Sequence, residues 1–381
     1  MPQITENSPA NQRRLLGLAG AMGFLMYGLG YCVPLAKRDF HVSRATASIH
    51  NLVFASLLLL SSYYLSRIIT RYTPSKVMRS GWVVVICGVA IFTSAPNIWI
   101  SIPGYGLCAL GATLFNNTNA GTLSQGKGSS LTLMLRAAGI GTAGGACAPL
   151  LIGTLVGKGV SWRITLFLIT AIVAALGYWL VPEVPDRSPT TAQGKVKFDR
   201  QLKLLLVLGF TANMLEVGAG AWALDLMTQR SIANASALIF ASFFSYGIAT
   251  SRLSFSVLTR LGAGKIWLIS AAIAGLGLAM IVITRSGPLT VVGLIVAAIG
   301  IGPLGGIAVA LAADSPRGAD LGISANVMGA AIAIGIGPWL VGVISDSLGF
   351  AYAYSMTFMI LLICSVLFVI LLREFEPYER R

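Results

Sequence analysis

Twelve runs of mostly apolar residues, each close to 20 residues long, constrain the fold of this chain more than any other feature. A helix needs roughly 20 apolar residues to cross the hydrocarbon core of a bilayer. Membrane strands would need alternating segments of about ten residues, which do not occur here. The runs lie at residues 15–36, 46–66, 78–95, 98–120, 131–156, 163–182, 203–227, 236–258, 265–284, 288–313, 321–344 and 351–372. The sequence therefore predicts an all-α membrane protein with twelve transmembrane helices.

The composition excludes a water-soluble enzyme. Charged residues make up only 10% of the chain, whereas a soluble globular protein carries about 25%. The net charge of +14 would suggest a nucleic-acid partner in a soluble protein. In a membrane protein the same excess fits the bias of basic residues toward cytoplasmic loops. We therefore expect a multi-pass protein of the cell membrane, with no nucleic-acid partner and no enzymatic activity.

The distribution of basic residues predicts the orientation. An even number of spans places both termini on one side of the membrane. If that side is the cytoplasm, 18 basic residues lie inside and 7 lie outside, which supports cytoplasmic termini. The outer group Lys37, Arg38 and Arg44 runs against this trend.

A charged hydrophilic stretch divides the chain into two halves. It runs from Glu183 to Lys203, contains Pro185 and Pro189, and shows no apolar period. Such a composition is typical of a linker. We expect an N-terminal six-helix bundle at 1–182, a cytoplasmic linker at 183–202 and a C-terminal six-helix bundle at 203–381.

The second half repeats features of the first half at a fixed shift of 189 residues. The matched pairs are Thr70 with Thr259, Arg71 with Arg260, Lys76 with Lys265, Pro149 with Pro338, and Gly153 with Gly342. Parallel six-helix repeats related by an axis along the membrane normal are the plan of major facilitator transporters.

On these residues the chain resembles the major facilitator superfamily over nearly its whole length. The family signature Gly-x-x-x-Asp-Arg-x-Gly-x-Arg/Lys reads here as Ser66-x-x-x-Thr70-Arg71, and again as Phe255-x-x-x-Thr259-Arg260. Both copies lack the Asp, which in the family helps to latch the cytoplasmic gate. The resemblance implies gating roles for Arg71 and Arg260, and for Pro149 and Pro338 as points where helices bend.

A narrower resemblance concerns the runs at 203–227 and 236–258. The pattern Glu216-x-Gly218-x-Gly220-x-Trp222, followed by a Phe-rich stretch that ends at Arg252, is similar to the fucose-permease-like branch of sugar–proton symporters. Ser251 stands where that branch usually has Gly.

Glu216 is the sharpest candidate for a functional residue. It lies thirteen residues from Lys203 and fourteen from Arg230, so a helix places it ~20 Å from either end, near the midplane. An ionised, unpaired carboxylate is costly there, so Glu216 should be protonated or paired with an arginine. Either state suits a proton-coupling carboxyl or an acceptor for a substrate hydroxyl. The alternative is a structural hydrogen bond to a neighbouring helix. Asn213 lies on the same helix face.

Two arginines are candidates for substrate binding. Arg252 precedes Arg260 by eight residues, which places it ~12 Å inside the cytoplasmic end of its helix. It could bind an anion, pair with Glu216 or extend to the interface. Arg136 has a similar but shallower position. Two arginines in the cavity would favour an anionic substrate, whereas one would leave a neutral polar substrate open.

The remaining acidic residues are expected to lie outside the binding cavity. Asp225 follows Glu216 by nine residues, which an unbroken helix rotates to the opposite face. Asp314 and Asp346 are expected in loops.

Uncharged polar residues in the apolar runs complete the candidate site. In the superfamily the first, fourth, seventh and tenth helices line the cavity, so the resemblance implies roles for residues there. Interhelical packing is the alternative for each of them. The candidates in these runs are Tyr27, Tyr31, Asn116, Asn119 and Trp222, and Asn326 in the eleventh run is a further candidate.

We expect no cofactor and no metal site. The glycine patterns at 139–144 and 300–305 fit a dinucleotide fingerprint, but they lie inside apolar runs and not between a strand and a helix. The chain has two histidines and five cysteines without metal-ligand spacing.

The sequence predicts a monomeric secondary transporter that works by alternating access. A small polar or anionic molecule, protons and the lipid bilayer would be its partners, with Glu216 as the coupling carboxyl. Two alternatives stay open. One is a proton-antiport exporter of amphiphilic compounds, and the other is a membrane sensor that has kept the fold and lost transport.

Overall fold

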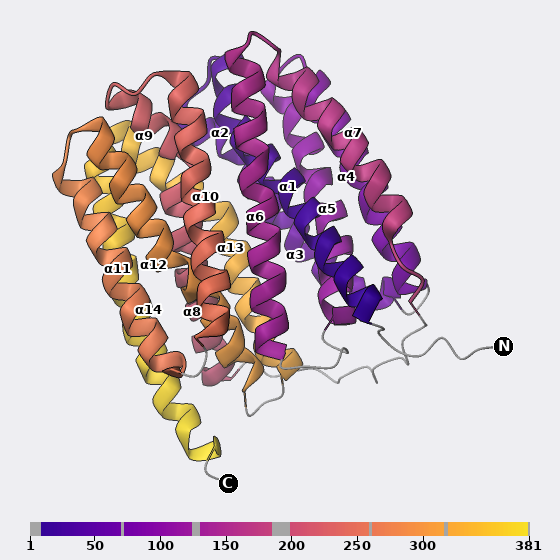
Figure 1. Ribbon diagram of the computed structural model, residues 1–381, viewed down its shortest axis with the longest axis vertical. Coiled ribbons are helices and arrows are strands. Elements are labelled where there is room, and N and C mark those ends of the chain that lie inside the picture. The colour runs from indigo at the N-terminus through magenta and orange to yellow at the C-terminus, as the bar shows by residue number, and fades with distance from the viewer. Residues whose placement is uncertain are drawn as a thin grey trace. The chain divides into compact units, whose positions relative to one another are not determined.

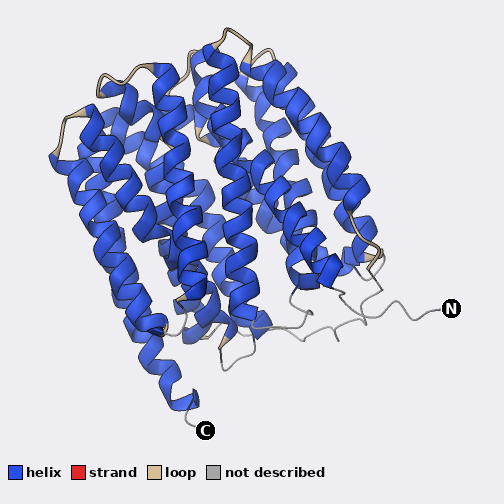
Figure 2. Ribbon diagram, in the orientation of Figure 1, coloured by secondary structure: helices blue, strands red, loops and turns tan. Residues whose placement is uncertain are grey.

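The regular structure is helical throughout the part of the chain that the computed structural model describes, which is residues 9–69, 72–123, 130–184, 199–258, 261–315 and 319–379 (Figure 2). Twelve long helices confirm the predicted number, and two short helices, α2 and α9, accompany them. Eleven of the long helices meet the length and hydropathy of a membrane span in these residues. The helices are α1 (Pro9–Asp39), α2 (Arg44–Ala47), α3 (Ile49–Ile69), α4 (Pro74–Ser94), α5 (Ile98–Leu123), α6 (Ser130–Gly157), α7 (Trp162–Leu180), α8 (Arg200–Gly220), α9 (Ala223–Gln229), α10 (Asn234–Val257), α11 (Ala263–Ile283), α12 (Gly287–Ala313), α13 (Ala319–Ser347) and α14 (Phe350–Glu379) (Figure 1).

The helices form two compact units. Unit 1 comprises Met1–Phe40 and Val53–Val196, and unit 2 comprises His41–Leu52 and Lys197–Arg381. The short segment 41–52, which contains α2 and the start of α3, therefore belongs with the C-terminal helices.

Helices at equivalent positions make the same contacts within each unit, as a repeated sequence requires. The first and fifth long helices of each unit form a pair, which is α1 with α6 in unit 1 and α8 with α13 in unit 2. The third helix packs on the fourth and the sixth, so α4 contacts α5 and α7 while α11 contacts α12 and α14. The shift of 189 residues thus corresponds to one packing scheme used twice.

Glycine allows the first and fifth helices to approach closely. A Cβ atom built on Gly23 of α1 would lie 2.0 Å from the carbonyl oxygen of Gly141 on α6. In unit 2 a Cβ atom on Gly209 of α8 would lie 2.1 Å from the carbonyl oxygen of Asn326 on α13. Small residues at such crossings let backbones meet and increase van der Waals contact.

The predicted helix at 203–227 is broken near its C-terminal end. α8 ends at Gly220 and α9 begins at Ala223. A break leaves the last carbonyl groups of α8 without intrahelical donors. The buried Tyr354 hydroxyl donates to the carbonyl oxygen of Ala219 at 2.7 Å and satisfies one of them. The rotation expected for Asp225 assumed an unbroken helix, so that argument does not hold.

Two further observations concern the ends of helices. Asp346 was expected in a loop, but it lies inside the last turn of α13. At the start of the linker, the buried Ser75 hydroxyl donates to the carbonyl oxygen of Pro182 at 2.9 Å and accepts from the amide of Val184 at 2.7 Å. The end of α7 and the first linker residues are thereby fixed to α4.

Candidate functional site

An ion pair inside unit 2 joins the two charged residues that the sequence places deepest in the membrane. Arg252 on α10 donates from Nη2 to Oε2 of Glu216 on α8, at 2.5 Å. The side chains are 11% and 18% exposed, so the pair is largely shielded from solvent. Glu216 was expected to be either protonated or paired with an arginine, and the structure contains the ion pair with an arginine.

A third helix positions the arginine. Arg252 also donates from Nε to the carbonyl oxygen of Gly302 on α12, at 2.9 Å. Gly302 lies so close to α10 that a Cβ atom there would be 2.1 Å from the Ser251 hydroxyl. The Gly302-Pro303 segment is therefore closely packed, and the lack of a side chain lets the guanidinium reach the backbone of α12.

The other predicted residues of unit 2 contact the protein itself. Asn213 is half-buried and donates to the carbonyl oxygen of Gly209, one turn earlier on the same helix, at 2.9 Å. Trp222 is buried and donates from Nε1 to the carbonyl oxygen of Pro338, inside α13, at 2.7 Å. Asn326 is fully buried and donates to the carbonyl oxygen of Leu205 at 3.4 Å. The Asn213 bond stays within α8, whereas the bonds of Trp222 and Asn326 join α8 and the segment after its end to α13.

The predicted residues of unit 1 lie on three helices. On α1, Tyr27 packs against Gly145 of α6, and Tyr31 is also half-buried. On α5, Asn116 is exposed, whereas Asn119 is buried and donates to the carbonyl oxygen of Leu15 at 3.3 Å.

The remaining predicted residues lie on α6 or outside the described residues. Arg136 is exposed near the start of α6, and the buried Pro149 lies inside the same helix. The gating candidates Arg71 and Arg260 lie outside the described residues.

A charge cluster that joins α2 to α9 and α13 was not predicted from the sequence. Arg44, at the start of α2, donates from Nε to Asp225 at 2.9 Å and from Nη1 to Asp346 at 2.6 Å. Asp225 is only 3% exposed, and the Arg44 guanidinium lies 5.0 Å from the ring centre of Phe350. The departure of Arg44 from the inside bias of basic residues was the one available signal.

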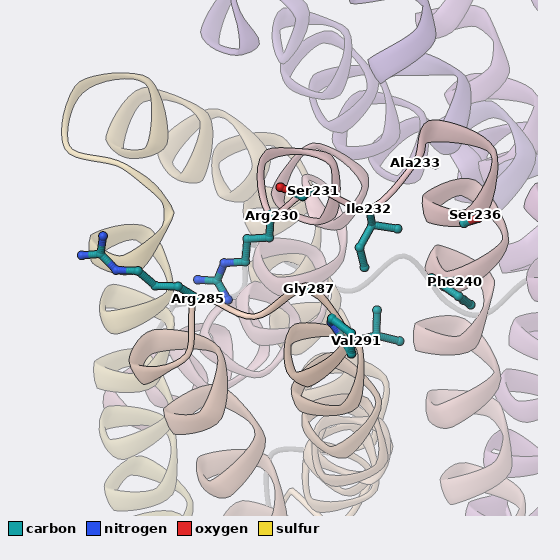
Figure 3. Close-up of a pocket in the computed structure, with 10 residues that line it drawn as sticks. Arg230, Ser231, Ile232, Ala233, Ser236, Phe240, Arg285, Gly287 and Val291 are labelled. Carbon is teal, nitrogen blue, oxygen red and sulfur yellow. The ribbon is translucent and has the colours of Figure 1, made fainter.

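A cavity of about 690 Å³ lies beside the α9–α10 turn (Figure 3). Its charged lining residues are Arg230 and Arg285, and the Arg285 side chain points away from the cavity in Figure 3. Arg230 donates to the Thr290 hydroxyl at 2.6 Å and to the carbonyl oxygen of Ile281 at 2.8 Å. Its charge thus joins the α9–α10 turn to α11 and α12. The Glu216–Arg252 ion pair is therefore the stronger candidate for the functional site.

The comparisons with known proteins agree with this architecture. The structure of a bacterial homologue of the human lysosomal transporter Spinster, inward-facing and occupied, aligns with a TM-score of 0.73 and 16% identity, over 96% of this chain and 98% of that one. The outward-facing major facilitator transporter FucP aligns with a TM-score of 0.65 and 12% identity, over 93% and 97%. At these identities the likeness concerns the fold alone.

The sequence itself gives the family. No curated protein matches the chain. A family model described as the Major Facilitator Superfamily matches residues 15–314, which is most of the chain and covers the ion pair. The chain is therefore a multi-pass membrane protein that belongs to the Major Facilitator Superfamily of secondary transporters.

Proposed function

We propose that this protein is a proton-coupled transporter of a small polar or anionic solute, placed in the cell membrane with both termini in the cytoplasm. Glu216 carries the coupled proton. Arg252, Arg136 and Asn213 contribute to the solute site, together with Asn116, Asn119, Asn326, Tyr27, Tyr31 and Trp222. The observation that supports this proposal is the shielded contact between Glu216 and Arg252.

The ion pair has two states of different charge. With Glu216 ionised, the carboxylate and the guanidinium compensate each other. With Glu216 protonated, the attraction to Arg252 falls and the two side chains can separate. A conformational equilibrium responds to any ligand that binds one state better than the other, and a proton on Glu216 is such a ligand. Alternating access coupled to protonation follows from this dependence.

Uptake into proteoliposomes under an inward proton gradient tests the proposal. Glu216→Gln should remove proton-driven accumulation while exchange of internal for external solute continues. Glu183→Gln is the matched control, because Glu183 is 68% exposed and lies after the end of α7, where it pairs with Arg79 near the start of α4. Wild-type coupling in the Glu216→Gln protein would refute the proposed role of this carboxyl.

A further inference from the structure

We propose that the cavity beside the α9–α10 turn binds a phosphate group, carried either by a lipid headgroup or by a free solute. All its lining residues belong to unit 2, and they do not include Glu216 or Arg252. The site therefore goes beyond the proposed function and does not depend on it. Three features of the cavity support it: the charge of its lining, the helix ends that meet there, and its position along the spans.

The lining of the cavity carries positive charge without a compensating acid. The cavity has a volume of about 690 Å³, and its two charged lining residues are Arg230 and Arg285. No Asp or Glu lines it among the residues that the structure describes. Ser231 and Ser236 add two hydroxyl groups, which can donate hydrogen bonds. Such a lining favours an anion with several oxygen atoms over a neutral or cationic ligand.

Arg230 is held in place at the wall of the cavity. Its Nη1 and Nη2 donate to the Thr290 hydroxyl and the Ile281 carbonyl oxygen, and the Thr290 hydroxyl donates in turn to the carbonyl oxygen of Ser286 at 2.8 Å. Neither acceptor of the guanidinium is ionised, so these bonds orient the positive charge without neutralising it. Burial lowers the pKa of Arg230, and the positive charge of Arg285 contributes in the same direction. A bound anion would stabilise the charged form of Arg230 against both effects.

Arg285 can turn toward a ligand without breaking a polar contact. It is exposed at the α11–α12 turn, and its side chain points away from the cavity in Figure 3. Within the described part of the chain its guanidinium forms no hydrogen bond and no ion pair. A guanidinium presents several donors in a planar fork that matches phosphate oxygens. Arg285 is therefore the residue that closes the site around a phosphate next to the fixed Arg230.

The N-terminal ends of two long helices also meet at the cavity. α10 begins at Asn234 and contributes Ser236, and α12 begins at Gly287, which itself lines the cavity. Neither N-cap residue, Ala233 or Ser286, forms a side-chain cap. The first amide groups of a helix lack intrahelical acceptors and carry a partial positive charge. They add to the attraction that the two arginines exert on an anion.

Gly287 brings these helix ends together. A Cβ atom built on Gly287 would lie 2.7 Å from the carbonyl oxygen of Arg230 and 2.9 Å from the side chain of Ile232. The lack of a side chain therefore lets the start of α12 approach the α9–α10 turn closely. Because of this approach, the residues on both turns border one cavity.

The position of the cavity along the helices suits a phosphate. The candidate span Gly287–Ala312 begins at the cavity, and the span Arg200–Gln229 ends beside it. The cavity therefore lies where the hydrocarbon core meets the headgroup region, which holds the lipid phosphates. Ile232, Phe240 and Val291 add apolar lining that can contact the carbon atoms next to a phosphate. A water-soluble phosphate ester reaches the same level from the aqueous side.

Thermal unfolding with phosphate probes tests the site. The purified protein in a neutral detergent is titrated with inorganic phosphate, glycerol 3-phosphate and dihexanoylphosphatidylglycerol. Potassium chloride at equal ionic strength controls for salt, and dihexanoylglycerol controls for the acyl chains. A ligand that binds the folded state raises the melting temperature. We expect such a rise with phosphate in the wild type, and an affinity about tenfold weaker in Arg285→Gln, which loses a charged hydrogen bond. Arg285→Lys should be intermediate, because it keeps the charge.

Arg373→Gln is the matched control for the variants. Arg373 is also an exposed arginine of unit 2, but it lies on α14 and does not line the cavity. It should keep the wild-type affinity for phosphate. Without added phosphate, Arg285→Gln should melt together with the wild type, so that its weaker binding cannot result from a folding defect.

The three probes identify the source of the phosphate. A rise with phosphatidylglycerol alone would support a lipid headgroup as the ligand, whereas a rise with glycerol 3-phosphate or inorganic phosphate would support a soluble one. No rise with any phosphate, or equal rises in the wild type and Arg285→Gln, would overturn the site. Either of these negative results would leave the proposed coupling role of Glu216 standing, because that role is measured by proton-driven uptake.

Discussion

Replacement of Gly23 by alanine should destabilise unit 1 through one backbone contact. The new Cβ atom would lie 2.0 Å from the carbonyl oxygen of Gly141, whereas ordinary contact begins at 3.4 Å. The obstructing atom belongs to the backbone of α6, so no side-chain rotation can relieve the clash. α1 and α6 would have to separate by about 1.4 Å along this direction, since close-packed interiors do not absorb such a shift locally.

The loss in free energy of unfolding follows from this displacement. Insertion of a carbon into a well-packed interior costs typically 1–3 kcal/mol, and a rigid backbone obstacle places the value near the upper end, at about 3 kcal/mol. Alanine also gains roughly 0.5–1 kcal/mol over glycine inside a helix. A control must cancel that gain. Gly17 provides it, because it lies on the same helix and a Cβ atom there meets nothing within 4 Å.

Thermal unfolding in detergent, followed with a thiol-reactive or intrinsic fluorescence probe, measures the difference. One kcal/mol shifts the melting temperature by roughly 2–4 °C in a domain of 150–250 residues, which is the size class of unit 1. Gly23→Ala should therefore melt about 6–12 °C below Gly17→Ala. Gly17→Ala should equal or slightly exceed the wild type. If the two variants melt together, the helices do not meet at this contact and the reasoning fails.

Three further predictions concern hydrogen bonds to buried or half-buried groups. Arg230→Gln should lower the free energy of unfolding by about 1.5–3 kcal/mol, because it loses charged hydrogen bonds to two helices, while the exposed Arg285→Gln should leave it unchanged in the same urea or thermal titration. Tyr354→Phe should cost about 1–3 kcal/mol, since a carbonyl at the end of α8 becomes a buried acceptor without a donor; a melting temperature equal to the wild type would contradict that assignment. Ser75→Ala should increase the rate of proteolysis in the linker after α7 without loss of the helical circular dichroism signal, because its hydroxyl holds both Pro182 and Val184. Unaltered cleavage rates would show that the linker start is held by other contacts.

The sequence predicts the twelve helices and their repeat because both depend on local composition. An apolar run long enough to cross a bilayer must satisfy its backbone internally, so it forms a helix wherever it lies. Equivalent glycines and prolines at a constant shift then require equivalent packing. The pairing of α1 with α6 and of α8 with α13 is the structural expression of that repeat.

The charge cluster around Arg44 could not be predicted in the same way. Arg44 and Asp225 are separated by 181 residues, and no local pattern connects them. The break between α8 and α9 also places Asp225 where an unbroken helix would not. Arg44 compensates the charge of the buried Asp225, so the environment of one residue depends on another in a different repeat.

The Glu216–Arg252 pair could be predicted only in part. Residue counting along a helix gives depth at about 1.5 Å per residue, which is why both side chains were expected inside the membrane. Depth says nothing about which helices are neighbours or which way their faces turn. The neighbour of α10 and the direction in which its face turns are fixed by the close approach of α10 to α12 at Gly302, where a side chain would collide with Ser251. Gly302→Ala should therefore displace α10, move Arg252 away from Glu216 and impair proton coupling, although neither charged residue is changed. Wild-type coupling in Gly302→Ala would mean that the ion pair does not depend on this crossing.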